Sequence, residues 1–286
     1  MIRTASILDE IVAHTRNRLP EAKEREPQEA LEQRIEETPP ARDFAGALRT
    51  GRIAVIAEVK RASPSAGLLK KRLNPVRLAS TYASAGASAI SVLTEPKYFR
   101  GALGDLLSVR VANIAVPLLR KDFVVDPYQV YQARAYGADA LLLIVAVLAD
   151  TKLADLLGHT RRLGMEALVE VHDEMEADRA VRAGAKVIGI NNRDLRDFSV
   201  DLTTTQRLRA LIPKDRVVVS ESGIKGPADI ARLWQWGVDA VLVGESLVIA
   251  QSPADKLREL FDVQYLEQPE IQPTAAASAA TKGGGV

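Results

Sequence analysis

Two opposite charges stand inside one apolar, strand-like run. In the segment 53–67, IAVIAEVKRASPSAG, Glu58 and Lys60 are two positions apart. Side chains of a strand alternate between its two faces, so both must point the same way. A buried charged pair is costly unless it is paired or used. Its position at the end of a strand, before a loop of small residues, is typical of α/β active sites and predicts one here.

Polar residues also end most of the other apolar runs of the chain. They are Lys121, Glu170, Asn191, the group Glu221, Ser222 and Gly223, and the group Gly244, Glu245 and Ser246. Any one of these residues could simply be solvated where its strand leaves the core. Both signs of charge recur on several strands, which favours one shared site for acid–base chemistry over separate solvated charges.

The last two strand ends indicate the kind of ligand. Ser222 and Gly223 follow the seventh run, and Gly244 and Glu245 follow the eighth. Open backbone N–H groups in such loops bind phosphate in barrels of this class, and Ser63 could add a hydroxyl. The alternative is that the glycines only make tight turns. Because the chain has no Walker-type loop, the phosphate is predicted to belong to a small substrate.

Aromatic and apolar residues could hold a planar ring at the same end of the strands. The candidates are Tyr98, Phe99, Phe123 and Leu142, although loop aromatics more often serve packing. The three histidines, His14, His159 and His172, show no metal-ligand spacing, so no metal site is predicted. His172 shares a face with Glu170 if the strand continues; the alternative is that it begins the following loop.

The elements that must position these residues alternate along the chain. Eight apolar runs cover 53–59, 88–94, 116–123, 140–146, 166–171, 186–191, 216–221 and 240–244. Helical patterns between them include 75–85, 127–136, 150–163, 173–184, 203–212 and 226–236. Eight alternating units predict an α/β fold, a closed (β/α)8 TIM barrel. An open doubly wound sheet is the rival, but no Gly-x-Gly-x-x-Gly turn follows the first run.

The two ends of the chain differ from this pattern. Residues 1–50 are predicted to form an N-terminal helical extension, with Ser6 as a helix N-cap and a second helix over 27–37. A short helix is expected from Asp43 to Leu48. The barrel is predicted over 51–262, and the Pro-, Ala- and Gly-rich segment 263–286 is predicted to be a disordered tail.

Composition excludes several classes of protein. The 286 residues carry 38 Lys and Arg against 37 Asp and Glu, which does not favour a nucleic-acid partner or a basic membrane-binding face. The chain has no cysteine, which excludes disulfides and cysteine catalysis and suits a cytoplasmic enzyme. No apolar run approaches the ~20 residues of a membrane span, and no signal peptide is evident.

Seven motifs in order resemble indole-3-glycerol-phosphate synthase. They are AEVKRASPS (57–65), LTEPKYF (93–99), LRKDFVVDPYQV (119–130), LVEVHDE (168–174), GINNRDL (189–195), SESGI (220–224) and VGES (243–246). The family is a (β/α)8 barrel of tryptophan biosynthesis. The resemblance implies ring closure of 1-(2-carboxyphenylamino)-1-deoxyribulose 5-phosphate with loss of carbon dioxide and water, without a metal or organic cofactor.

The resemblance also implies residue roles. Lys121 matches the general acid, Glu170 the general base, and Lys60 the lysine that holds the substrate carboxylate. Matching supports of the reacting carbons are Glu58, Asn191, Glu221 and Ser222. Matching phosphate positions are Ser63, Gly223, Gly244 and, through its backbone, Glu245. The anthranilate ring pocket matches Phe99, Phe123 and Leu142, and Arg193 matches a further polar position near the substrate.

Two alternatives remain open at this point. Phosphoribosylanthranilate isomerase resembles this family in fold but uses a catalytic cysteine, which this chain lacks. A barrel that only binds a phosphorylated metabolite is the non-enzymatic alternative, and the presence of Lys121 and Glu170 counts against it. The expected partner is the small phosphorylated, anthranilate-derived substrate, with no nucleic acid or membrane, and the protein is expected to be a monomer or a weak homodimer.

Overall fold

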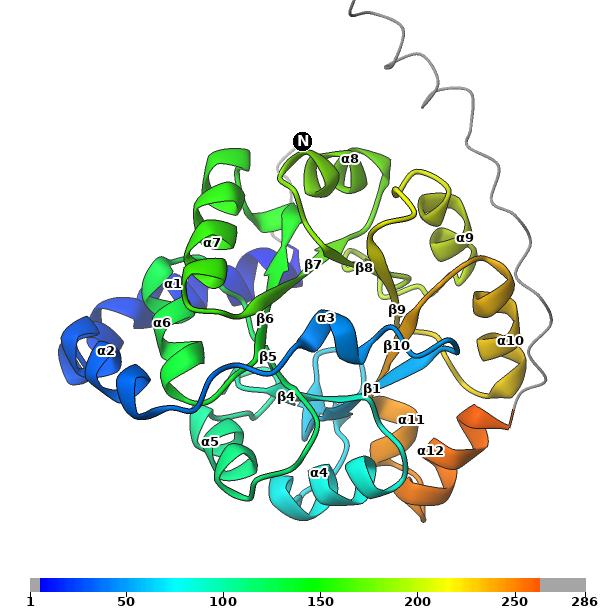
Figure 1. The fold of residues 1–286 in the computed structure, drawn as a ribbon, viewed down its shortest axis with the longest axis horizontal. Helices are drawn as coiled ribbons and strands as arrows, with labels where there is room; N and C mark the ends of the chain where they lie inside the picture. The colour runs from blue at the N-terminus through cyan, green and yellow to red at the C-terminus, as the bar shows by residue number, and fades with distance from the viewer. Residues whose placement is uncertain (1–5, 263–286) are drawn as a thin grey trace, which may run out of the picture.

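Eight parallel strands close into a barrel in the computed structural model, which describes residues 6–262 (Figure 1). The strands are β1 (Ala54–Val59), β4 (Ala89–Leu93), β5 (Leu118–Lys121), β6 (Ala140–Ile144), β7 (Glu166–Val171), β8 (Val187–Asn191), β9 (Val217–Glu221) and β10 (Ala240–Val243). Each pairs with the next in sequence, and β1 also pairs with β10. This closure confirms the predicted (β/α)8 barrel and rules out the open sheet.

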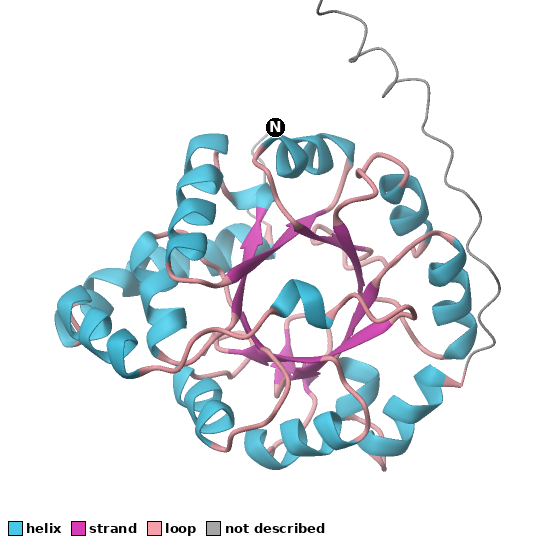
Figure 2. Ribbon diagram, in the orientation of Figure 1, coloured by secondary structure: helices cyan, strands magenta, loops and turns pink. Residues whose placement is uncertain are grey.

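A ring of helices covers the outside of the strands (Figure 2). They are α4 (Pro75–Ser84), α5 (Leu103–Val111), α6 (Pro127–Ala135), α7 (Asp150–Arg162), α8 (Glu174–Arg182), α9 (Thr203–Arg209), α10 (Pro227–Gln235), α11 (Glu245–Val248) and α12 (Pro253–Phe261), with a 3₁₀ turn η1 (Val145–Val147). Side chains such as Asn74 and Asp126 cap helix N-termini. Gly86 and Gly137, among others, adopt the positive φ that ends a helix.

The register of the strands brings the predicted polar residues to one end of the barrel. Lys121, Asn191 and Glu221 are each the last residue of a strand, and Asn191 pairs directly with Glu221. The strands are buried on both faces, as β1 shows along its whole length, because helices cover the outside and side chains fill the inside. A charge can therefore reach solvent only where its strand ends.

Three helices precede the barrel, as predicted for the N-terminal part of the chain. They are α1 (Ile7–Arg25), α2 (Gln28–Glu37) and α3 (Phe44–Ala47). Ser6 and Asp9 form a capping box at the start of α1. Leu31 of α2 is fully buried in a cluster with Tyr128 of α6, and the Tyr128 hydroxyl donates to the carbonyl of Ala22 at 2.9 Å. The extension is thus packed against the barrel by buried contacts.

Helix α3 lies across the ring of strands in Figure 2, at the end where the strands begin. Arg42, just before it, bonds to Asp139 ahead of β6, and Arg49, just after it, bonds to the Asp215 carbonyl ahead of β9. The opposite end of the barrel is left for the site. Division of the chain at residue 50 stays a prediction, and the tail at 263–286 lies outside the described residues.

A two-stranded hairpin that the sequence did not predict occupies the loop after β1. It pairs β2 (Ala62–Ser63) with β3 (Gly67–Leu68) in antiparallel fashion. This hairpin holds Ser63 beside the end of β1.

Within residues 6–262, no helix is both long and apolar enough to cross a membrane.

Candidate active site

A cavity of about 620 Å³ opens at the end of the barrel where the strands finish. Every residue to which the family resemblance gave a role lines it: Glu58, Lys60, Ser63, Phe99, Lys121, Phe123, Leu142, Glu170, Asn191, Arg193, Glu221, Ser222, Gly223, Gly244 and Glu245. They come from all eight strands or from the loops that follow them. The structure therefore brings the whole predicted set together, while the role of each residue remains a prediction.

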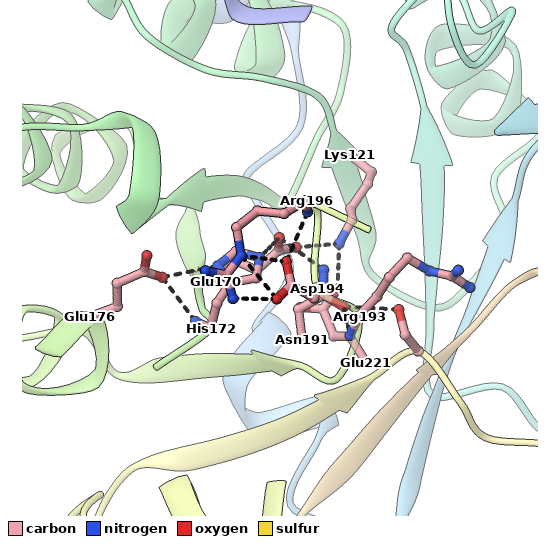
Figure 3. A network of polar contacts seen from close by, with 10 residues as sticks. Lys121, Glu170, His172, Glu176, Asn191, Arg193, Asp194, Arg196 and Glu221 are labelled. Carbon is pink, nitrogen blue, oxygen red and sulfur yellow. Dashed lines mark hydrogen bonds and ion pairs between the residues drawn. The ribbon is translucent and has the colours of Figure 1, made fainter. Parts of the chain in front are cut away.

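Lys121 lies at the centre of this set, between two carboxylates (Figure 3). Its Nζ is 3.0 Å from Glu170 Oε2 and also forms a short contact with Glu221 Oε2. Both carboxylates are buried, with residue exposures of 3% and 2%. Because they cross from β7 and β9 to the lysine of β5, the ion pairs fix one ammonium group over the floor of the cavity.

The three groups share their protons unequally. Burial alone would lower the pKa of Lys121, but the charges of Glu170 and Glu221 outweigh it and raise that pKa above its ordinary value. Burial would raise the pKa of Glu170, yet Lys121 and His172 hold it well below its ordinary value. Burial raises the pKa of Glu221 to about 7, against the pull of Lys121. Near neutral pH the site therefore combines a charged lysine, an ionised carboxylate and a carboxyl group poised to titrate.

Asn191 holds the other oxygen of Glu170. Its Nδ2 donates to Glu170 Oε1 at 3.2 Å, while its Oδ1 accepts from the Ser222 hydroxyl at 2.9 Å and from the Arg193 backbone N–H at 3.1 Å. The two acceptor contacts fix which end of the amide faces Glu170. Ser222 reaches this position with φ +67°, a conformation that is rare for a residue other than glycine.

Glu58 and Lys60, the two charges of the first apolar run, form an ion pair. Lys60 Nζ lies 2.8 Å from Glu58 Oε1, and both side chains are largely buried. The Glu58 carboxylate occupies the space in which a Cβ on Gly244 would stand. Glycine is needed at 244 for this packing, in addition to any role in a ligand-binding loop.

The candidate phosphate positions lie together on the cavity wall formed after β9 and β10. Gly223, Gly244 and Glu245 line this wall, with Ser63 in the hairpin after β1. Lys225 and Arg232, which the sequence reasoning did not single out, line the cavity as well. Two cationic side chains and several loop N–H groups give this wall the chemistry that a phosphate group requires.

The apolar wall lies on the other side of the cavity. The rings of Phe99 and Phe123 are 6.0 Å apart and tilted by 38°, and Leu142 lies within the same lining. Tyr98 is not part of the lining: its ring packs edge-on against His14 of α1 at 6.2 Å. Of the candidate ring-binding residues, Tyr98 thus serves loop packing.

Helix α1 supplies part of the cavity wall, a contribution that sequence reasoning missed. Ile7, Leu8 and Ile11 line the cavity beside the strand-end residues. Their spacing puts them on one apolar face of the helix, but the sequence does not show that this face covers the cavity. The N-terminal extension is therefore part of the site.

Two further carboxylate contacts were also missed. Glu95 accepts hydrogen bonds from the backbone N–H groups of Lys97, Tyr98 and Phe99 at 2.6–3.0 Å, which shapes the loop that carries Phe99. Glu176 of α8 accepts from His172, whose ring lies beside Glu170 (Figure 3). A buried acid directly after β4 was a usable signal for Glu95; no signal pointed to Glu176.

Comparison with solved structures agrees with the fold. Thiamine phosphate pyrophosphorylase from Pyrococcus furiosus aligns with a TM-score of 0.57 at 18% identity, covering 75% of this chain and 96% of that chain. At this identity the likeness concerns the barrel alone.

Within residues 6–262, no group of three or more His, Asp or Glu side chains is arranged to hold a metal ion.

Comparison with sequences gives a closer relationship. A sequence profile described as indole-3-glycerol phosphate synthase matches residues 8–260. A protein of that name from Roseiflexus sp. (strain RS-1) is 53% identical over 263 residues, covering 89% of this chain and 98% of the relative. Another, from Dehalococcoides mccartyi (strain CBDB1), is 50% identical over 258 residues, covering 89% of this chain and all of the relative. The chain therefore belongs to the indole-3-glycerol phosphate synthase family.

Proposed function

We propose that the protein closes the indole ring of 1-(2-carboxyphenylamino)-1-deoxyribulose 5-phosphate, releasing carbon dioxide and water. The observation that carries this proposal is the placement of Lys121 between Glu170 and Glu221, in one cavity with the Lys60–Glu58 pair. A cavity of about 620 Å³ with an apolar wall and a cationic wall suits a substrate with an aromatic ring at one end and a phosphate at the other.

Lys121 is the proposed general acid. As the ring carbon attacks the carbonyl carbon, the carbonyl oxygen becomes an alkoxide and takes a proton from the lysine. An alkoxide is strongly basic, so even a lysine whose pKa is raised can protonate it. The carboxylates on either side keep the ammonium group charged until that step and hold its Nζ in place.

Loss of carbon dioxide and then of water completes the reaction. Departure of carbon dioxide from the carboxylate returns the electron pair of the broken bond to the ring. The leaving hydroxyl then takes a proton from Lys60, whose ammonium group is still charged, as the remaining proton on the ring or nitrogen is removed. Glu170, held ionised by Lys121 and His172, is the proposed base. Asn191, itself held by Ser222, fixes its carboxylate, while Glu221 and Glu58 position the two lysines.

The rest of the cavity is proposed to bind the two ends of the substrate. Lys60 is placed to meet the substrate carboxylate, with Phe99, Phe123 and Leu142 around its ring. Ser63, Gly223, Gly244 and the Glu245 backbone are proposed to hold the phosphate, with Arg193 as a further polar contact. Two cationic lysines offset the negative charge of the bound substrate as the reaction proceeds.

The test is an assay of indole formation by fluorescence, with this substrate and a metal chelator present. Wild-type protein should form product, and Lys121→Ala or Glu170→Gln should lower kcat by about 10²- to 10⁴-fold while substrate still binds. Lys152→Ala, at a half-exposed lysine of α7, is the matched control and should stay active. Absence of product with wild-type protein would overturn the function, and full activity in both variants would overturn the assigned roles.

A further inference from the structure

We infer that His172 is a positioning residue for Glu170, and that Glu176 holds His172 in that position. This inference rests on the proposed role of Glu170 as the base. The three side chains form a line from helix α8 to the floor of the cavity, with the imidazole between two carboxylates (Figure 3). Sequence reasoning left His172 between two readings, the end of a strand or the start of a loop.

Glu176 binds His172 twice. Its Oε2 accepts the backbone N–H of His172 at 2.8 Å and lies 2.9 Å from the ring Nδ1. Asp173 caps helix α8 by accepting the Glu176 N–H at 2.8 Å. The carboxylate that contacts the ring therefore belongs to a residue in the fixed first turn of the helix. With backbone and ring both bound to one oxygen, the imidazole has little rotational freedom.

The opposite edge of the His172 ring is directed at Glu170, the proposed base. His172 Nε2 lies 3.3 Å from Glu170 Oε1, the oxygen that also accepts from Asn191. The second oxygen, Oε2, faces Lys121 and the cavity. His172 and Asn191 thus both act on Oε1 from behind, which leaves Oε2 as the oxygen presented to the substrate.

The surroundings of His172 favour its charged form. Glu170 faces it from β7, Glu176 from α8, and Asp194 from the loop after β8, where Asp194 is itself paired with Arg196. Burial would lower the pKa of His172, but its contacts with Glu170 and Glu176 outweigh burial and raise that pKa to about 10. A cation behind Glu170 in turn lowers the pKa of the base.

Loss of the imidazolium should therefore make Glu170 harder to ionise. In His172→Gln the acidic limb of the kcat/KM profile should move upward by about one pH unit, so kcat/KM should fall about ten-fold on that limb and stay close to wild type near neutral pH. Glu176→Gln keeps the His172 ring but holds it less firmly, because it removes one of the two carboxylates that contact the ring. A less firmly held imidazolium stabilises the Glu170 carboxylate less, while the loss of the Glu176 charge acts in the opposite sense, so the acidic limb should move in the same direction by a smaller amount.

The experiment measures kcat and kcat/KM from about pH 3.5 to 9 for wild type, His172→Gln and Glu176→Gln, so that the range includes the titration of Glu170. Asp178→Asn, at an exposed residue of α8 paired only with Arg182 among the contacts of the described chain, is the control and should reproduce the wild-type profile. A wild-type profile in both variants would overturn the inference. So would a lower kcat with an unmoved acidic limb, because that result signifies packing alone.

Failure of the proposed function would look different. If Glu170→Gln kept full activity, Glu170 would not be the base, whatever His172 does. If Glu170→Gln lost activity while His172→Gln and Glu176→Gln both kept the wild-type profile, only the positioning role of His172 would fall. If His172→Gln fails to fold, Glu176→Gln still decides the question, because it leaves the ring and the backbone of residue 172 in place.

Discussion

The carboxylate of Glu221 on β9 fills the space that a Cβ at Gly189 on β8 would occupy, two residues before Asn191, the register partner of Glu221. Because residue 189 has no side chain, Glu221 can lie inward and reach Lys121. The glycine has an ordinary negative φ, so its requirement comes from the close approach alone and not from backbone conformation.

The change Gly189→Ala should displace the Glu221 carboxylate and with it the ammonium group of Lys121. Because small misplacements of catalytic groups can cost two orders of magnitude, kcat should fall about 100-fold. Steady-state kinetics of indole formation measure it. Gly104→Ala is the control, since nothing lies within 4 Å of a Cβ there. Wild-type kcat in Gly189→Ala would contradict the claim that this contact sets the position of Lys121.

The change Glu95→Gln should weaken substrate binding more than turnover. Glu95 is 1% exposed and its carboxylate accepts three backbone N–H groups in the loop of Phe99. An amide offers one acceptor oxygen and presents its NH₂ group to the remaining donors, a loss of about 1.5–3 kcal/mol. We expect KM to rise at least about ten-fold with kcat little changed. The control Glu36→Gln, on the exposed face of α2, should leave both kcat and KM unchanged. A larger effect on kcat than on KM would contradict the claim that Glu95 acts on substrate binding through the loop of Phe99.

The stability contribution of His172 should depend on pH in a defined direction. Its pKa is raised from 6.5 to about 10 in the folded protein. The folded state therefore holds the proton more tightly, and the stabilisation is fully present below pH 6.5 and is lost as pH rises through 10. Denaturant unfolding should show that His172→Gln destabilises most at pH 6 and progressively less towards pH 10. A constant or growing difference would mean that the imidazole is not charged in the folded protein.

Asp139 offers a test of stability apart from the site. It is fully buried at the start of β6, pairs with Arg110 at 2.7 Å, and accepts the backbone N–H groups of Arg42 and Leu118 at 2.8 Å. Removing it leaves a buried guanidinium unpaired, so Asp139→Ala should cost about 3–5 kcal/mol in denaturant unfolding. Asp155→Ala, at a half-exposed residue of α7, should change stability by less than about 1 kcal/mol. Because Asp139 lies at the far end of the barrel, kcat of the folded fraction should be unchanged, and a lower kcat would contradict this separation.

The barrel could be predicted from sequence because its signal is repeated and local. Each strand is a short apolar run between helical patterns, and eight of them admit few arrangements. The convergence of Glu58, Lys121, Glu170 and Glu221 followed from topology, since parallel strands finish at one end. Helix α5 was not among the predicted helices, although its weakly amphipathic segment lies between two correctly predicted strands.

Contacts made between loops and helices could not be predicted in this way. Glu176 sits among other charged residues of α8, and only the tertiary structure shows that it alone turns towards His172. The apolar stripe of α1 indicated a buried face, but the same stripe could have covered any apolar surface. Gly189 had no turn signal, because its function is to make room for a side chain of the next strand.

The cluster on the cavity floor has one more consequence. The carboxylates of Glu58, Glu170 and Glu221 are balanced by the ammonium groups of Lys60 and Lys121 and by the imidazolium of His172, until the proposed substrate adds a carboxylate and a phosphate of its own. Glu221, whose pKa already lies at about 7, is the group best placed to relieve that excess of negative charge by taking up a proton. Substrate capture above neutral pH should then withdraw hydrogen ions from the buffer, so that affinity and acidity are linked before any bond is made.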